Sequence, residues 1–315
     1  MAYILDPADE MRNFLTRFDY PSNQFLNETL CDEVVGKRNL LKEFMIGKRG
    51  EGCSVNTLGA YFQTLKDFLW HFKDVPLSEL RGSDIKEYLI TYQASRNISN
   101  STLDNMRRNL NSFFTYLVIE DYLDKNPMLK IHKIKSDSII KMPFSEEELE
   151  RIRDACGNIR ELALIDFLYS TGVRVSECVN ADIGDFNMLH QEGVVYGKGG
   201  KERIVYLDTR AKIHLERYFA VRRDESPALF VRPTPPFIRV SKPGVEYMVR
   251  MIGQRAHVTG CHPHRFRRTL ATRLLERGMP IEQVQAVLGH TKIDTTLLYA
   301  RVNQQNVKLN HSRYV

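Results

Sequence analysis

Hydrophobic positions in the first half of the chain recur at helical spacing. Between residues 58 and 72 the large apolar side chains lie three or four residues apart, which places them on one face of a helix. An earlier helix around residues 40–44 should end at the Gly50 break. Ser83 is expected to cap a short third helix, and Ser101 with Asp104 resembles a capping box that opens a fourth. The pattern predicts a small bundle of four helices.

The helical pattern lapses after Pro127 and resumes near residue 145. Residues 130–143 carry several lysines and few large apolar side chains other than isoleucine, and we expect an exposed basic linker there. Ser145 and Glu148 then form a capping-box pattern at the start of a new helix. The second half should again be mostly helical, with helices expected near residues 209–222, 241–257, 263–277, 280–288 and 294–302.

One stretch of the second half favours strand. Two short runs rich in β-formers, residues 194–196 and 203–207, flank the sequence GKGGKE. Glycines at this density between two such runs are typical of a β-hairpin. The chain is therefore expected to be mainly α-helical, with two domains and a small antiparallel sheet in the second.

Composition narrows the class of protein. The 315 residues carry a net charge of +6, and residues 256–315 hold nine basic and three acidic side chains, which is the whole excess. A basic surplus confined to one segment fits either a polyanion-binding surface or a solvated face. No signal peptide or membrane-spanning stretch is evident, so a cytoplasmic protein is expected. The five cysteines are Cys31, Cys53, Cys156, Cys178 and Cys261. Their odd number and scattered positions argue against a disulfide framework.

Four separated segments supply polar side chains that packing alone explains poorly. They are STGVRVSE from residue 170, the hairpin GKGGKER from residue 197, HRFRR from residue 264, and LGHTKIDTTLLYA from residue 288. His264 and Arg267 are three residues apart and should share one side of a helix. Taken singly, each segment has an ordinary explanation as a surface arginine, a turn or a packed tyrosine.

Taken together, these segments resemble the catalytic domain of the tyrosine site-specific recombinases, the lambda-integrase and Xer superfamily, in type, order and spacing. The resemblance covers residues 144–302, and the helices SVNTLGAYFQTLKDFL and STLDNMRRNLNSFFTYL extend it to the family's core-binding domain. It implies a SAM-like helical bundle followed by an α-rich catalytic domain. The divisions expected are an N-terminal extension at 1–25, a core-binding domain at 26–129, a linker at 130–143, a catalytic domain at 144–302 and a tail at 303–315.

The resemblance also implies the site and its chemistry. Carried over by position, the family's catalytic residues fall on Arg174, Lys198, His264, Arg267, His290 and the nucleophile Tyr299, with Glu177 in support. Arginine forks suit the charge that gathers on a phosphodiester in its transition state, and a phenol suits reversible covalent attack. Lys198 is expected as general acid, with Lys201 as a competitor, while His264 either accepts the tyrosine proton or bonds a phosphate oxygen. Arg268 stands where relatives often have histidine.

The implied partner is double-stranded DNA carrying specific sites, cut by a homotetramer on two sites with a possible accessory directionality factor. No cofactor and no metal are expected, although Cys261, His262, His264 and His290 could be drawn as ligands. A mobile-element integrase is favoured, a Xer-like resolvase acting in the bacterial nucleoid is the second interpretation, and a non-cleaving DNA-binding protein is the third. Candidate DNA contacts are Lys201, Arg203, Lys242, Arg250, Arg255 and Arg268.

Overall fold

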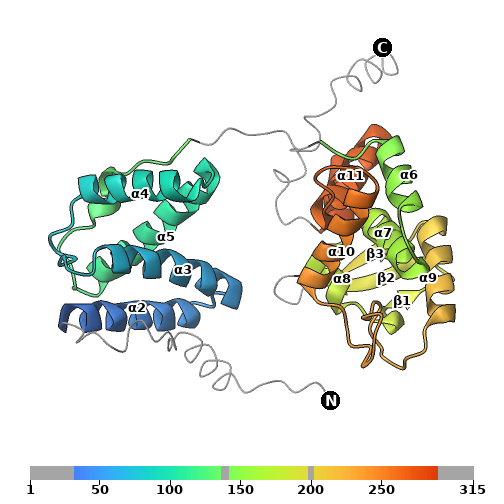
Figure 1. The fold of residues 1–315 in the computed structure, drawn as a ribbon, viewed down its shortest axis with the longest axis horizontal. Coiled ribbons are helices and arrows are strands. Elements are labelled where there is room, and N and C mark those ends of the chain that lie inside the picture. The colour runs from blue at the N-terminus through green and yellow to red at the C-terminus, as the bar shows by residue number, and fades with distance from the viewer. Residues whose placement is uncertain (1–31, 136–141, 198–201, 290–315) are drawn as a thin grey trace, which may run out of the picture. The chain divides into compact units, whose positions relative to one another are not determined.

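The computed structural model describes residues 32–135, 142–197 and 202–289. The chain divides into two compact units, residues 1–138 and 139–315 (Figure 1). The described part is mainly helical, with one small antiparallel sheet in the second unit, so the predicted fold class is confirmed. Within these residues, no helix is both long and apolar enough to span a membrane.

The first unit is a bundle of four helices around an aromatic core. Apolar side chains from all four helices meet at its centre, where Phe44 and Phe113 lie 5.3 Å apart between ring centroids in an edge-on contact. Such contacts add about 0.5–1.5 kcal/mol beyond the burial of the rings. The elements are α2 (Asp32–Gly50), α3 (Val55–His71), α4 (Gly82–Arg96), α5 (Asn100–Ile119) and the 3₁₀ turn η1 (Pro127–Lys130).

Two predicted caps of this unit are wrong, because neighbouring side chains compete for the same backbone groups. Helix α4 begins at Gly82, and Asp84 accepts the backbone N–H of Arg81, while Ser83 lies inside the helix. Helix α5 is capped by Ser99, two residues before the predicted Ser101. Asp104 instead pairs with Arg107 and accepts the N–H of Ile134.

The expected linker begins as part of the first unit. Ile131 is buried, Ile134 packs against the bundle core, and the carbonyl of Lys135 accepts a bond from the Asn100 amide. The expectation of an exposed segment is therefore wrong for Ile131 and Ile134, which make apolar contacts, whereas Lys133 and Lys135 are exposed as expected. Residues 136–141 and the N-terminal extension lie outside the described residues.

The second unit surrounds the sheet with helices (Figure 1). Its first helix is capped by Ser145, and Glu148 bonds back to the Ser145 N–H, which confirms the predicted capping box. The core takes buried side chains from the helices before the sheet, from those after it and from the inner face of the sheet. The elements are α6 (Glu146–Asp154), α7 (Ile159–Thr171), α8 (Val175–Asn180), η2 (Ile183–Asp185), β1 (Phe186–Asn187), β2 (Glu192–Tyr196), β3 (Glu202–Tyr206), α9 (Thr209–Val221), α10 (Lys242–Arg255), α11 (Pro263–Glu276) and α12 (Ile281–Leu288).

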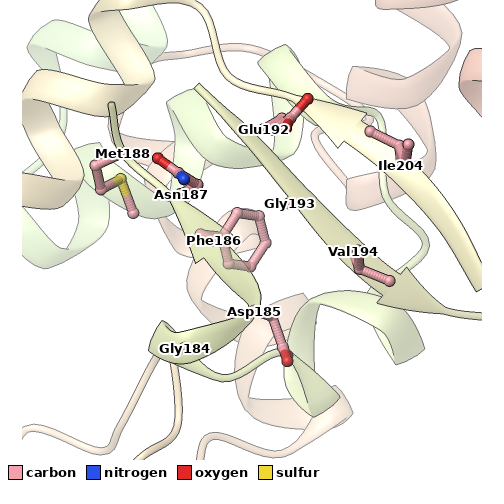
Figure 2. A pocket seen from close by; sticks show the side chains of 9 residues that line it. All are labelled: Gly184, Asp185, Phe186, Asn187, Met188, Glu192, Gly193, Val194 and Ile204. Carbon is pink, nitrogen blue, oxygen red and sulfur yellow. The ribbon is translucent and has the colours of Figure 1, made fainter. Parts of the chain in front are cut away.

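The sheet has the order β1-β2-β3 and contains the predicted hairpin, with Val195 opposite Arg203. The sequence pattern does not predict strand β1, because two residues are too short to show an alternation. Gly193 lets the ring of Phe186 lie against β2, since a Cβ at this position would come within 2.3 Å of the ring. Figure 2 shows this ring among the side chains that line a hollow on the sheet. The residues that line the hollow do not include Arg174, Arg203 or Arg267.

Candidate active site

Arg174 is delivered by the turn between α7 and α8. Helix α7 ends at Thr171, and Gly172 adopts φ +57°, in the left-handed region that favours glycine. A Cβ there would also lie 2.8 Å from Leu270 Cδ2 and 3.2 Å from Leu288 Cδ2. The glycine therefore lets this turn approach α11 and α12 closely, and Arg174 follows as the N-terminal boundary residue of α8.

Arg267 crosses the centre of the same region from α11. It is only 4% exposed, and its Nη1 donates to the Gly172 carbonyl at 2.5 Å. Its Nη2 donates to the Leu288 carbonyl. One buried guanidinium thus joins the ends of two helices, and its aliphatic stem packs near Gly172.

Three arginines meet at the C-terminal end of α12, one on each of three consecutive carbonyls. Arg203 donates to Val287, Arg267 to Leu288, and Arg174 to Gly289 at 3.1 Å. The last carbonyls of a helix have no partner within it and carry partial negative charge, so cations are stabilising here. Gly289 ends the helix with φ +62°. The last three carbonyls at this end of α12 are therefore each bonded by a guanidinium.

Glu177 orients two of these arginines. Its side chain is fully buried, with Oε1 accepting from Arg174 Nη1 and Oε2 accepting from Arg203 Nη2, both at 2.7 Å. Oε2 also accepts the backbone N–H of Arg174 at 2.8 Å. Burial by itself raises the pKa of this carboxyl, but the bonds and charges of Arg203 and Arg174 outweigh it and hold the pKa below its ordinary value. Glu177 is therefore ionised at neutral pH.

His264 lies one turn before Arg267 on α11, as the three-residue spacing predicted. Partial loss of hydration lowers the pKa of its imidazole, and the positive charges of Arg267, Arg174 and Arg268 lower it further. His264 is thus one helical turn from the residue that joins Gly172 to the end of α12. A ring with this pKa is neutral at pH 7 and has a lone pair to accept a proton or a hydrogen bond.

The structure thus gathers Arg174, Glu177, His264 and Arg267 in one region. Four other predicted residues, Lys198, Lys201, His290 and Tyr299, lie outside the described residues. Their neighbours in sequence are informative, however, because Gly289 immediately precedes His290 and Arg203 follows the turn that carries the two lysines. The described residues that flank both segments, Arg203 and Gly289, belong to the arginine cluster.

The candidate DNA contacts divide into two groups. Lys242, Arg250 and Arg255 are exposed on α10, where Arg250 lies over the Tyr247 ring and Arg255 pairs with Glu161. Arg268 donates to the Met142 carbonyl. Arg203, by contrast, has a side chain only 10% exposed and bonds Glu177 and the end of α12.

The engagement of Arg203 was missed by sequence reasoning, although the strand pattern contains a signal for it. Side chains two residues apart in a strand share a face, and Val205 is fully buried. Arg203 therefore points to the inner face of β3. A basic residue on the inner face of a strand needs a buried acceptor, and Glu177 is that acceptor.

With this geometry in place, comparison with known proteins defines the class. Residues 117–306 match the phage integrase family, and residues 40–124 match the N-terminal SAM-like domain of phage integrases. The chain belongs to the phage integrase family.

Among individual relatives, the chain is 30% identical over 269 residues to the tyrosine recombinase XerC of Staphylococcus haemolyticus, covering 81% of this chain and 89% of that protein. It is likewise 30% identical over 279 residues to the tyrosine recombinase XerD of Oceanobacillus iheyensis, covering 84% and 93%. The solved structures that share the fold include XerH bound to a palindromic difH substrate (TM-score 0.70, 19% identity, 99% of this chain and 98% of that chain covered) and a lambda integrase dimer bound to a COC′ core site (TM-score 0.70, 17% identity, 83% and 94% covered).

Proposed function

We propose that this chain is a site-specific tyrosine recombinase that cleaves and rejoins duplex DNA through a 3′-phosphotyrosyl intermediate on Tyr299. The observation that carries the proposal is the convergence of three arginines on the end of α12, directly before His290. The names of the relatives, which are tyrosine recombinases, support it.

Arg174 and Arg267 act as the phosphate clamp. A guanidinium has five N–H donors and stays protonated, and each of the two arginines gives one donor to the end of α12. These bonds fix the plane of each guanidinium before DNA arrives. Donors held in place in this way stabilise the charge that develops on the nonbridging oxygens without having to reorganise during the reaction.

The remaining groups move protons. The Tyr299 oxygen attacks phosphorus, the bond from phosphorus to the 5′-oxygen breaks, and Lys198 gives that oxygen a proton. His264 accepts the phenolic proton, for which its lowered pKa suits it, and His290 donates to a phosphate oxygen. The 5′-hydroxyl of a partner strand reverses these steps, so the energy of the broken bond is kept in the phosphotyrosine.

The DNA complex follows from the same proposal. The two units hold duplex DNA, with Lys201, Lys242, Arg250, Arg255 and Arg268 contributing phosphate contacts and therefore a salt-dependent affinity. Four copies assemble on two sites, residues 303–315 of each copy contact a neighbour, and an accessory factor sets direction. The enzyme works on nucleoid DNA in the bacterial cytoplasm.

Covalent capture tests the chemistry and identifies the target site in the same experiment. The protein is incubated with nicked duplexes sheared from its host genome, denatured, and recovered with any DNA still attached, which is then sequenced. A unique sequence attached to wild-type protein and absent with Tyr299→Phe supports the proposal. Specific binding without any adduct would instead indicate a non-cleaving DNA-binding protein, and an adduct retained in Tyr299→Phe would refute the assigned nucleophile.

The captured sequence also separates two biological roles. A site beside the gene and at the ends of a mobile segment supports integration and excision, which is the role we favour. The similarity of this chain extends over about nine-tenths of the XerC and XerD relatives, which favours the second role, resolution of chromosome or plasmid dimers. A single chromosomal site that resolves tandem copies on a plasmid would support that second role.

A further inference from the structure

Arg203 is a largely buried basic residue, and the proposed reaction gives it no role. It is the second residue of β3, and its side chain makes two hydrogen bonds, to the Val287 carbonyl and to Glu177 Oε2. Its stem packs against Gly289, where a Cβ would lie 2.4 Å from its Cδ and 3.0 Å from its Nε. The side chain is thus held from three sides.

The geometry argues against a direct phosphate contact by Arg203. Each terminal nitrogen already donates one hydrogen bond within the protein, and the side chain is only 10% exposed, so a phosphate has little access to the N–H groups that remain. Its Nε is buried and has no acceptor among the described residues. An orphaned buried donor is costly, so the bonds made by the terminal nitrogens must determine where this guanidinium lies.

Those bonds control how Glu177 holds Arg174. A carboxylate and a guanidinium prefer to pair side by side through two parallel bonds. Here Oε2 accepts from Arg203 and from the backbone N–H of Arg174, while the Arg174 side chain bonds Glu177 with Nη1 alone and directs Nη2 to the Gly289 carbonyl. These are the two side-chain bonds of Arg174 among the described residues, which leaves three of its five N–H groups to face a ligand. Arg174 is 35% exposed, so a ligand can reach them.

We propose that Arg203 is a positioning residue for the phosphate clamp: by sharing Glu177 with Arg174 and bonding the end of α12, it prevents a side-by-side Glu177–Arg174 pair and keeps the donors of Arg174 directed at the scissile phosphate. This inference rests on the proposed recombinase function. It assigns Arg203 an effect on the cleavage step and no direct contact with DNA.

The test measures binding and cleavage separately, on a nicked duplex of the captured site. Arg203→Met should bind this duplex within about threefold of wild type, with an unchanged salt dependence. Its single-turnover cleavage rate at saturating DNA should fall about 100-fold. Arg203→Lys should fall about tenfold, because one ammonium can reach Glu177 or the Val287 carbonyl but cannot fork between them.

Arg222→Met is the matched control for a merely structural loss. Arg222 is also a buried arginine that bonds a carboxylate and backbone carbonyls, but its partners, among them Asp224 and Ala228, lie in the loop after α9. This variant should lose comparable stability and cleave at the wild-type rate per folded molecule.

A double-mutant cycle with Glu177→Gln identifies the route. If Arg203 acts through Glu177, the double variant should cleave no more slowly than the slower single variant. Additive losses would overturn the inference, as would wild-type cleavage by Arg203→Met or Arg203→Lys, or a weakened affinity with a smaller salt dependence. These outcomes require a wild-type protein that forms the adduct, so they are distinct from failure of the proposed function.

Discussion

In each unit, positively charged side chains donate to backbone carbonyls at the C-terminal end of one helix, but the two arrangements differ. In the first unit, Lys37 donates to the carbonyls of Phe72, Lys73 and Val75, just beyond the end of α3, at 2.6–2.9 Å. In the second unit, Arg203, Arg267 and Arg174 each donate to one of the carbonyls of residues 287–289.

The difference lies in how many donors the backbone consumes. An ammonium has three N–H groups, and three backbone carbonyls match that number. The three guanidiniums bond the three carbonyls and, in addition, Glu177 and the Gly172 carbonyl. The first arrangement matches three N–H groups to three backbone carbonyls, whereas in the second the Arg174 side chain makes two bonds among the described residues and keeps N–H groups for a ligand. A buried cationic cap therefore indicates a binding site only when its donors outnumber the acceptors of the fold.

The two arrangements can be compared by replacing one residue that bonds the helix end with methionine in each unit, beginning with Arg267. Arg267→Met removes a clamp guanidinium and should lower single-turnover cleavage of the captured duplex about 1,000-fold. Duplex binding should stay within about fivefold, because many other phosphate contacts remain. A cleavage loss below tenfold per folded molecule would mean that Arg267 serves the fold alone.

Lys37→Met should produce the opposite result. It leaves three carbonyls without their charged donor, and the free energy of unfolding of the first unit should fall by about 3 kcal/mol in urea titrations. Cleavage per folded molecule should remain at the wild-type rate. Lys86→Met, on an exposed position of α4, is the control and should stay within about 0.5 kcal/mol. Equal stability of the two variants would contradict the role assigned to Lys37.

The glycine that ends α12 provides a third test, because its backbone conformation and its surroundings both disfavour a side chain. Gly289→Ala places a Cβ at φ +62° and against Arg203, which must move away from Glu177. We expect a loss of about 2 kcal/mol in stability and about tenfold in cleavage rate. Gly278 has φ +89° and open space around it, so Gly278→Ala isolates the backbone cost of about 1 kcal/mol. Equal cleavage by the two variants would show that the contact with Arg203 has no effect.

The outline of the fold was predictable because it depends on local patterns. The spacing of apolar residues indicated most of the described helices, and the glycines between two β-rich runs indicated the hairpin. The caps were less predictable, since Ser99 and Ser101 are chemically equivalent and only packing decides which of them begins the helix. The same limit applies to Ile131, whose burial depends on contacts with the bundle that the lysine-rich local sequence does not reveal.

The site, like the fold, was predictable where it depends on local sequence and was not predictable where it depends on tertiary contacts. The resemblance to tyrosine recombinases named Arg174 and Arg267, and the structure brings both to the end of α12. The link from Arg203 to Val287 spans 84 residues and depends on how β3 meets α12. A motif gives residue types in order along the chain, so it does not reveal that one carboxylate is shared between Arg174 and Arg203. That sharing became visible only when the donors and acceptors were matched in three dimensions.

The smallest expected effect concerns His264, and its sign follows from the cluster of arginines beside it. The pKa of its imidazole lies below the ordinary value of 6.5, so between these two values the unfolded chain binds more protons than the folded one. The contribution of His264 to stability is therefore full above about pH 6.5 and is lost as pH falls toward the folded pKa. Because water reaches part of the ring, the loss should be modest.

His264→Asn removes this titration while leaving the other acid-sensitive groups in place. The difference in unfolding free energy between wild type and His264→Asn should therefore shift against the wild type between about pH 7.5 and about pH 5.5. An NMR titration of the imidazole should give a midpoint below 6.5, and the midpoint should rise in Arg267→Met, which takes away the neighbouring positive charge that lowers this pKa most. A midpoint that does not respond to Arg267→Met would show that the ring and the guanidinium do not share a site, and would separate the proton acceptor from the phosphate clamp.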